Sequence, residues 1–168
     1  KYKIIMHTDA VQTLGKIPVN TKELGADCMS FSAHKFYGPK GVGALFIKKD
    51  LKLKPLIIGG NQERRMRAGT ENTSGISGLG LAAELATNNL HKTQSHLISL
   101  THAFKAQITH IYPEVIFNGH PEKQLPGLVN VSFPGFRNDL LMIHLDRQGI
   151  AVSSGSACSS GDIKPSRI

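Results

Sequence analysis

Cysteine is scarce in this chain, in which Cys28 and Cys158 are the only two. They lie far apart and no Cys-x-x-Cys pair occurs, so the sequence excludes a disulfide scaffold and the usual spacing of a zinc or redox motif. No apolar run reaches the roughly 20 residues that a membrane-spanning helix needs. We therefore expect no membrane association and a reducing compartment, with the cytoplasm as the simplest location.

Acidic residues are also few, 12 against 20 lysines and arginines, which gives a net charge of +8. Only Arg64, Arg65 and Arg67 form a dense basic cluster, and no helix-turn-helix, zinc-finger or aromatic stacking motif accompanies them. We interpret this charge as a solvated basic surface and expect no nucleic-acid partner. Histidines such as His91 and His96 have no ligand-like spacing to carboxylates, so no metal site is expected.

The first 50 residues alternate short apolar runs with turn signals. Residues 3–7 (KIIMH) and 28–31 (CMSF) are continuous apolar runs, typical of strands buried on both faces. Between them, residues 21–27 (TKELGAD) predict one short amphipathic turn of helix that ends at Gly25, and residues 42–49 predict a third strand. This strand–helix–strand order predicts an α/β fold.

From Ile76 onward the apolar residues repeat with the period of a helix, which predicts a long helix near residues 75–109. We expect its N-cap at Thr73–Ser74 and a bend near Asn88–Asn89 or Thr93. The expected core stripe of this helix consists of Ile76, Leu79, Ala83, Ala86, Leu90, Leu97, Leu100, Phe104 and Ile108.

Beyond this helix the pattern changes again. Residues 115–119, 128–133 and 149–154 predict strands, and a helix is predicted between Asn138, as its cap, and Gly149, at its end. We therefore expect a larger domain over residues 1–92 and a smaller α+β domain over residues 93–168, joined by the long helix.

Polar side chains follow two of the predicted strands at the points where the strands end. Asp9 and Gln12 follow the first strand, and Ser32, His34 and Lys35 follow the second. In open α/β sheets, ligands bind beyond the carboxyl ends of the strands. Taken singly, each residue has an ordinary explanation as a turn former or a solvated side chain. Together, in this order, they predict a binding site.

The chemistry of this set favours one ligand. A lysine amine held between apolar neighbours can condense with an aldehyde, and a buried carboxylate can keep a pyridine nitrogen protonated. A hydroxyl and an imidazole can bind a phosphate, and an amide can bond to a phenolic oxygen. Pyridoxal 5'-phosphate is the cofactor that needs all of these groups.

The residues that carry this chemistry resemble a known family. HTDAVQTLGKIPV and SFSAHKFYGPKGVGALF resemble the cofactor segment of class V aminotransferases, and more closely the cysteine desulfurases of the NifS/IscS type. The resemblance extends to GGNQERRMRAGTEN and SSGSACSSGDIKPSRI, and so covers nearly the whole chain. It implies part of the large domain of a fold type I pyridoxal-phosphate transferase, with a mixed, mostly parallel sheet, plus part of a small C-terminal α+β domain.

The resemblance also assigns roles within the cofactor segment. It implies that Lys35 bonds covalently to the cofactor, that Asp9 partners the pyridine nitrogen and that Gln12 contacts the phenolic oxygen. Ser32 and His34 match phosphate ligands.

Two further residues lie outside the cofactor segment. Thr70, in RAGT, matches a residue that reaches the phosphate of the neighbouring subunit, which implies a homodimer. Cys158 lies among serines and glycines, typical of an exposed, mobile thiol, and it matches the family's persulfide-forming cysteine. Cys28, inside an apolar run, is interpreted as a core residue.

The resemblance implies removal of sulfur from L-cysteine, with release of L-alanine and a persulfide on Cys158 that passes to an acceptor such as an iron–sulfur scaffold protein. The family pattern places a ring-stacking imidazole and an asparagine before Lys1, and a carboxylate-binding arginine after Ile168. We therefore expect that the chain lacks an N-terminal part and a C-terminal tail and that its site alone is incomplete. Two alternatives stay open: a selenocysteine lyase or other class V relative, and a truncated, non-catalytic interaction module.

Overall fold

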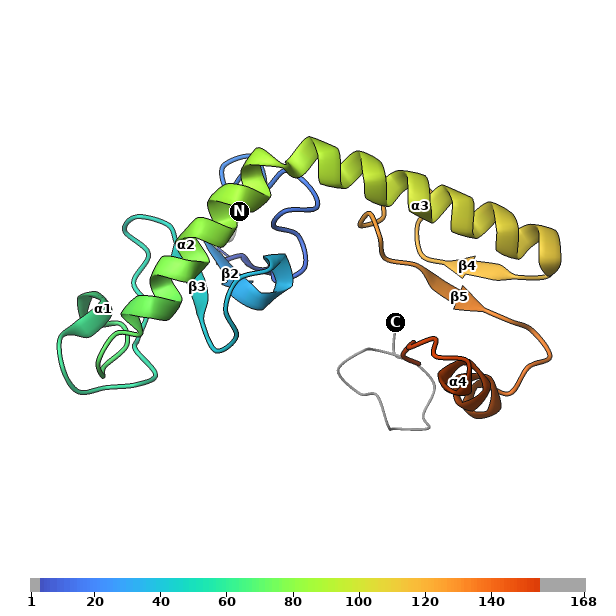
Figure 1. The fold of residues 1–168 in the computed structure, drawn as a ribbon. Helices are drawn as coiled ribbons and strands as arrows, with labels where there is room; N and C mark the ends of the chain where they lie inside the picture. Colours follow the sequence, from blue (N-terminus) through green and yellow to red (C-terminus); the bar gives the residue numbers. More distant parts are fainter. Residues whose placement is uncertain (1–3, 155–168) are drawn as a thin grey trace. The chain divides into compact units, whose positions relative to one another are not determined.

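The computed structural model describes residues 4–154 of the chain (Figure 1). These residues form two compact units, the first made of residues 4–104 and 121–128 and the second of residues 105–120 and 129–154. No helix among residues 4–154 combines the length and the apolar character that crossing a membrane requires.

A three-stranded mixed sheet forms the centre of the first unit. Its strands are β1 (His7–Asp9), β2 (Cys28–Ser32) and β3 (Gly43–Ile47), in the order β1-β2-β3. β1 and β2 are parallel, with Asp9 opposite Ser30, whereas β2 and β3 are antiparallel. The predicted α/β class and the parallel pairing of the first two strands are therefore confirmed.

The first strand is shorter than predicted and begins later in the sequence, since it covers residues 7–9 and the predicted strand covers residues 3–7. Ile4, Ile5 and Met6 are 80%, 58% and 47% exposed, so this apolar run is not a buried strand. The segment is held by its backbone, because the Met6 amide donates to Asp27 Oδ2 and the Met6 carbonyl accepts from the amides of Asp27 and Cys28. These bonds fix the main chain without enclosing the apolar side chains.

The predicted turn of helix over residues 21–27 is present as a single turn, in which the Leu24 amide donates to the Asn20 carbonyl. The structure has a hydrogen-bonded turn there, in which Asn20 Oδ1 accepts from the amides of Lys22 and Glu23. An asparagine side chain that accepts from the second and third amides after it caps the start of a helical turn. Gly25, with φ +64°, then reverses the chain.

The core beneath β2 is small and well enclosed. Met29 is fully buried, and it packs with Ala10 and Ala26 against Val19, Phe31 and Phe46. Cys28 is 4% exposed, which confirms its interpretation as a core residue.

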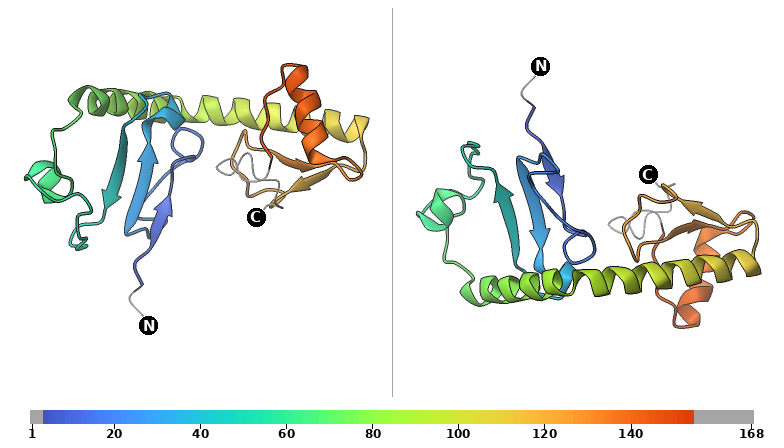
Figure 2. Two further views of the ribbon diagram at one scale, coloured as in Figure 1. Left: turned by 90° about the horizontal axis from the view of Figure 1, so that it is seen from below. Right: turned by 90° about the horizontal axis from the view of Figure 1, so that it is seen from above.

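A second core joins the end of β2 to a helix. The 3₁₀ helix η1 (Ala33–Phe36) buries Ala33 and Phe36 against Ala82 of α2 (Thr73–Asn88). Figure 2 shows η1 between the end of β2 and α2. The N-cap of α2 is Asn72, whose Oδ1 accepts from the Gly75 amide, and not the predicted Thr73–Ser74.

The predicted break in the long helix is confirmed at Asn89. This residue separates α2 from α3 (Leu90–Ile111), and both its amide and its side-chain Nδ2 donate to the Leu85 carbonyl. The predicted stripe is only partly buried. Leu79, Ala83 and Ala86 pack on the second core, whereas Ile76, Leu100 and Phe104 are 43%, 53% and 43% exposed because no described element covers them.

The second unit holds a two-stranded antiparallel sheet and a helix. β4 (Ile116–Asn118) pairs with β5 (Asn130–Ser132), and α4 (Asn138–Arg147) follows. The cap of α4 is Arg137, so Asn138 is the first helical residue and not the predicted cap. The rings of Tyr112, Phe133 and Phe136 pack together, and Tyr112 Oη donates to the Pro134 carbonyl at 2.6 Å.

The predicted strand over residues 149–154 is wrong. After Gly149, with φ +74°, the Ile150 amide donates to the Leu145 carbonyl, which folds the chain back onto the end of α4. Within residues 4–154 this segment pairs with no strand. An apolar run forms a strand only where a neighbouring strand can hydrogen-bond to it. Residues 149–154 have no such neighbour among residues 4–154, so they are irregular.

Candidate functional site

The predicted site residues of the first unit lie at one edge of the sheet. Asp9 is the last residue of β1 and Ser32 is the last residue of β2. Because β1 and β2 are parallel, both strands end at the same edge, and the Ala10 amide donates to the Ser30 carbonyl there at 3.0 Å. The structure thus confirms that the two strand ends come together.

Asp9 and Gln12 lie in the turn that leaves β1. Asp9 Oδ1 accepts from the Val11 amide at 3.0 Å, which orients the carboxylate and leaves Oδ2 available to another donor. Gln12 is exposed, and its Oε1 accepts from Lys16 Nζ at 2.9 Å. One acceptor of each side chain is therefore committed to the protein, while the carboxylate Oδ2 and the amide Nε2 are left for a ligand.

Ser32 and His34 form a hydrogen-bonded pair at the start of η1. Ser32 is the N-cap residue of η1, but its hydroxyl makes no capping bond and instead lies 2.8 Å from His34 Nδ1. A hydroxyl and an imidazole held at this distance present two groups that can donate to one anion. This pairing was not evident from the sequence, although both residues were predicted as phosphate ligands.

Lys35 follows on the exposed side of η1. Ala33 and Phe36 are buried against α2, so His34 and Lys35, between them, face outward. Lys16 lies close enough to Lys35 to be affected by its charge. Burial, and then the positive charge of Lys35, lower the pKa of Lys16 below its ordinary value of 10.5. Two lysine amines therefore share this edge of the sheet.

The site is more open than the sequence-based chemistry suggests. Asp9, His34 and Lys35 are all exposed, whereas the cofactor chemistry described above calls for a buried carboxylate and an amine among apolar neighbours. The reason is that two strand ends, one turn and η1 build this edge, and no described element packs over it. Among residues 4–154, no group of histidine, cysteine and acidic side chains could hold a metal ion.

Thr70 lies apart from this group. It is exposed in the segment between α1 (Gln62–Arg65) and α2, and its carbonyl accepts from Arg67 Nη1 at 3.3 Å. Among residues 4–154, Thr70 and Lys35 share no hydrogen bond. Cys158 lies outside the described residues.

The basic cluster that precedes Thr70 has an unusual backbone. Glu63, Arg64 and Arg65 have φ values of 46°, 56° and 67°, so three successive residues adopt the left-handed backbone conformation. That conformation costs roughly 1–2 kcal/mol for each residue other than glycine. Such strain is commonly found at functional segments, but nothing in these residue types predicts it from sequence.

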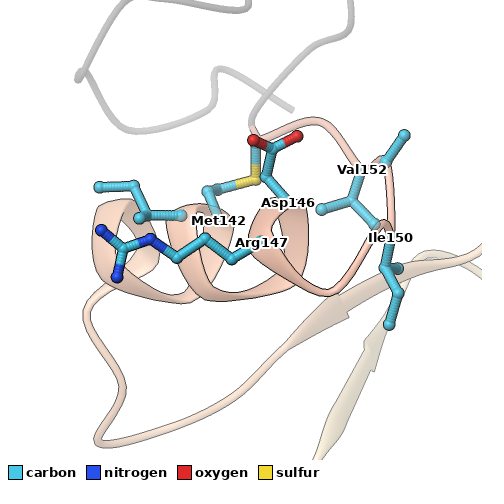
Figure 3. A pocket seen from close by; sticks show the side chains of 7 residues that line it. Met142, Asp146, Arg147, Ile150 and Val152 are labelled. Carbon is cyan, nitrogen blue, oxygen red and sulfur yellow. The ribbon is translucent and has the colours of Figure 1, made fainter.

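The second unit contains a separate pocket of about 380 Å³ beside α4. Figure 3 shows that Met142, Asp146 and Arg147 line it from the helix, and Ile150 and Val152 from the segment that follows. None of the predicted site residues lines it. Its lining is mainly apolar, so the described residues give it no evident catalytic chemistry.

The donor set at the edge of the first unit fits pyridoxal 5'-phosphate. Asp9 Oδ2 can accept from a pyridinium N–H, and the Gln12 amide nitrogen can donate to a phenolic oxygen. The Ser32–His34 pair can bind a phosphate, and the exposed Lys35 amine can reach an aldehyde. The second amine, Lys16, adds positive charge that favours an anionic ligand.

Known proteins with similar sequences are named cysteine desulfurases. The IscS cysteine desulfurase of Dictyoglomus turgidum is 49% identical over 168 residues, which are all of this chain and 43% of that protein. The NifS cysteine desulfurase of Azotobacter vinelandii is 39% identical over 165 residues, or 98% of this chain and 41% of that protein. The chain thus spans less than half the length of these relatives.

Solved structures share the fold. A NifS-like protein from Rickettsia africae matches 90% of this chain and 42% of its own, with a TM-score of 0.85 and 36% identity. Another NifS-like protein matches 89% of this chain and 40% of its own, with a TM-score of 0.82 and 42% identity. The family model of class-V aminotransferases matches residues 1–166. The chain therefore belongs to the class-V aminotransferase family.

Proposed function

We propose that the protein containing this chain is a cysteine desulfurase that depends on pyridoxal 5'-phosphate and converts L-cysteine to L-alanine. The observation that carries the proposal is the arrangement of Asp9, Ser32, His34 and Lys35 at the edge where two parallel strands end. Relatives named cysteine desulfurase, at up to 49% identity among those described above, support the choice of this reaction within the family.

Each residue has a role that follows from its chemistry. Bound pyridoxal 5'-phosphate supplies an aldehyde for covalent attachment and a ring that accepts the electron pair released at the substrate's α-carbon. Asp9 accepts a hydrogen bond from the ring nitrogen, and Gln12 donates to the phenolic oxygen. Ser32 and His34 hold the phosphate. Lys35 Nζ anchors the cofactor and, once free, carries the α-proton as general base and acid.

Cys158 is the proposed sulfur acceptor. Its thiolate attacks the sulfur of the substrate, so that an S–S bond forms while the substrate's carbon–sulfur bond breaks. The carbon gains a proton, and L-cysteine plus the thiol give L-alanine plus a persulfide, which balances without another oxidant or reductant. The persulfide then passes to a sulfur-acceptor protein such as an iron–sulfur scaffold.

The proposed assembly is a cytoplasmic homodimer in which Thr70 reaches the cofactor phosphate of the neighbouring subunit. The exposure of Thr70 supports this proposal, because an exposed side chain is accessible to a neighbouring subunit. Mixed dimers of Lys35→Ala and Thr70→Ala subunits test it, since one of their two sites has both residues intact. Recovery of activity above that of both parent variants supports the shared site, and no recovery contradicts it.

The proposed domain division assigns residues 1–92 to the large cofactor-binding domain and residues 93–168 to the small C-terminal domain. The helix break at Asn89 supports a boundary in this region, whereas the compact units described above divide later, after residue 104. Limited proteolysis of the intact protein with mapped cleavage sites tests this division.

The decisive experiment follows the sulfur atom in the full-length protein. Borohydride reduction should attach the cofactor to Lys35, as read by peptide mass mapping. With ³⁵S-labelled L-cysteine, the protein should retain label at Cys158 and release alanine. Cys158→Ala should keep the cofactor and lose the label, whereas Cys28→Ala, at a buried position, should keep both.

The same experiment separates the alternatives. Release of alanine without label on Cys158 indicates a lyase, and amino transfer to a keto acid indicates an aminotransferase. Absence of cofactor uptake, with no effect of Lys35→Ala, indicates a non-catalytic interaction module. Each of these results contradicts the proposed function.

A further inference from the structure

Lys16 is a site residue that the sequence patterns did not single out. It lies in the turn after β1, four residues beyond Gln12, and its Nζ is 2.9 Å from Gln12 Oε1. Its side chain is partly buried, unlike those of Gln12 and Lys35. A lysine stem that is partly enclosed has fewer conformations than a solvated one, so its amine is held near one position.

The hydrogen bond decides which end of the Gln12 amide faces the site. A lysine ammonium has three donors and no acceptor, so only the oxygen of the amide can face Lys16. The amide nitrogen of Gln12 must then point away from Lys16. Without such a partner, the two ends of an exposed glutamine amide exchange freely, and half of its orientations present the wrong group to an acceptor on a ligand.

The turn that carries Lys16 is fixed by its backbone. The amides of Lys16 and Ile17 both donate to the Thr13 carbonyl, at 3.0 and 3.1 Å. Gly15 lies against α2, where a Cβ atom would be 3.1 Å from Ala86 Cβ. η1 also packs against α2. The turn that contains Lys16 and the 3₁₀ turn that contains Lys35 therefore both contact the same helix.

Lys16 and Lys35 also interact through their charges. Burial and the neighbouring charge of Lys35 both lower the pKa of Lys16. Asp9 and His34 are titratable side chains at the same edge, and they are the same in every variant considered below.

We propose that Lys16 is a positioning residue that fixes the Gln12 amide with its nitrogen toward the phenolic oxygen of the cofactor. This inference rests on the proposed function, because the oxygen that Gln12 meets belongs to pyridoxal 5'-phosphate. It assigns to Lys16 no contact with the substrate.

The test compares three lysine variants in the full-length protein. Lys16→Met keeps an unbranched apolar stem and removes the donor, Lys16→Arg keeps both donor and charge, and Lys22→Met is the control at an exposed position of the same segment. Two quantities are measured without substrate: the dissociation constant for pyridoxal 5'-phosphate and the pH midpoint of the absorbance change of the bound cofactor.

Lys16→Met should weaken cofactor binding by about threefold to tenfold, the range expected for one hydrogen bond. It should also raise the pH midpoint, because loss of a positive charge and of an oriented donor stabilises the protonated form of the bound cofactor. Lys16→Arg and Lys22→Met should both remain close to the unmodified protein.

A double-mutant cycle isolates the action through Gln12. If Lys16 acts by orienting this amide, Lys16→Met should have a smaller effect in a Gln12→Ala background than in the unmodified protein. Equal effects in both backgrounds overturn the positioning role. So does Lys16→Met with unchanged binding and an unchanged midpoint, or Lys16→Arg that behaves like Lys16→Met.

The failure of this inference is distinguishable from the failure of the proposed function. If the unmodified protein takes up the cofactor on Lys35 and transfers sulfur while Lys16→Met changes neither quantity, only the role of Lys16 is wrong. If borohydride attaches no cofactor to Lys35, both proposals are wrong.

Discussion

Gly78 of α2 and Pro39, which follows η1, are packed so closely that a side chain cannot fit between them. A Cβ atom added at Gly78 would lie 2.6 Å from Pro39 Cγ and 3.1 Å from Pro39 Cδ. Gly38 makes a similar approach, since its Cβ would meet Ala33 Cβ at 2.9 Å and Ala82 Cβ at 3.1 Å. Residues on both sides of Lys35 are therefore held against α2 by contacts that depend on small side chains.

We expect Gly78→Ala to destabilise the protein. Alanine favours a helix over glycine by up to about 1 kcal/mol, but overpacking of this kind costs about 1–3 kcal/mol and the ring of Pro39 is not a flexible neighbour. The melting temperature should fall and cofactor binding should weaken as η1 shifts.

Gly80→Ala is the matched control for this change, because nothing lies within 4 Å of its Cβ position in the same helix. It should raise the melting temperature slightly through helix propensity alone. Equal shifts for the two variants would show that the contact with Pro39 does not constrain the helix.

Asn72→Ala tests the start of α2. Asn72 Oδ1 accepts from the Gly75 amide at 3.0 Å, and loss of an asparagine N-cap costs about 1 kcal/mol. Denaturant unfolding should show a loss of that size for Asn72→Ala and little change for Thr73→Ala, whose side chain has no recorded hydrogen bond. The opposite ranking would restore Thr73 as the cap.

Asp27→Asn tests the attachment of the chain to the start of β2. The Met6 amide, and then Lys48, whose Nζ is 3.0 Å from Asp27 Oδ1, hold the pKa of Asp27 below its ordinary value of 3.8. A lowered folded-state pKa means that the carboxylate stabilises the fold above that ordinary value, and that this contribution is lost as the pH falls through the folded-state pKa.

The difference in melting temperature between the unmodified protein and Asp27→Asn should therefore be largest near neutral pH and shrink below about pH 4. Glu84→Gln, at an exposed position of α2 with no recorded hydrogen bond among the described residues, should give a difference that hardly changes with pH. A constant difference for Asp27→Asn would mean that its bonds to Met6 and Lys48 do not act through the charge.

Ser32→Ala and His34→Ala test the proposed phosphate site. The Ser32 hydroxyl and His34 Nδ1 are 2.8 Å apart, and hydrogen bonds to a charged group are worth about 1.5–3 kcal/mol. Each variant should therefore bind pyridoxal 5'-phosphate about tenfold to a hundredfold more weakly.

Pyridoxal, which has no phosphate, provides the comparison for these two variants. Its affinity should be nearly the same with and without Ser32 or His34, and Ser77→Ala on α2 should change neither affinity. A parallel loss of pyridoxal binding would show that the two residues shape the site rather than bind the phosphate.

Sequence patterns predicted the positions of the candidate site residues because these residues lie at the ends of strands. The apolar run at Cys28–Phe31 and the polar residues after it place Ser32 and Lys35 at a strand end, and the parallel pairing of β1 and β2 brings Asp9 to the same edge. The break at Asn89 was also foreseeable, since two asparagines interrupt the helical period.

The misplaced elements depend on contacts that a pattern does not contain. β1 begins at His7 because Asp27 bonds to the backbone of Met6, 21 residues away. Within residues 4–154 the segment after Gly149 has no ladder partner, and the left-handed turn at Glu63–Arg65 uses residues with no preference for positive φ. The Lys16–Gln12 hydrogen bond had a detectable signal in its four-residue spacing, but in a turn such spacing does not imply contact.

The support that η1 receives from α2 has a consequence for engineering. A single turn of 3₁₀ helix has too few internal bonds to set the orientation of the Lys35 amine, so this task falls to the neighbouring helix α2, whose contacting residues Ala82 and Gly78 carry no reactive group. Altering the bulk of Ala82 or Gly78 by one methyl at a time should therefore adjust how the amine is presented to a reactant while every polar group is left untouched. Substitutions in α2, which has no proposed contact with the cofactor, could then change the reactivity of Lys35.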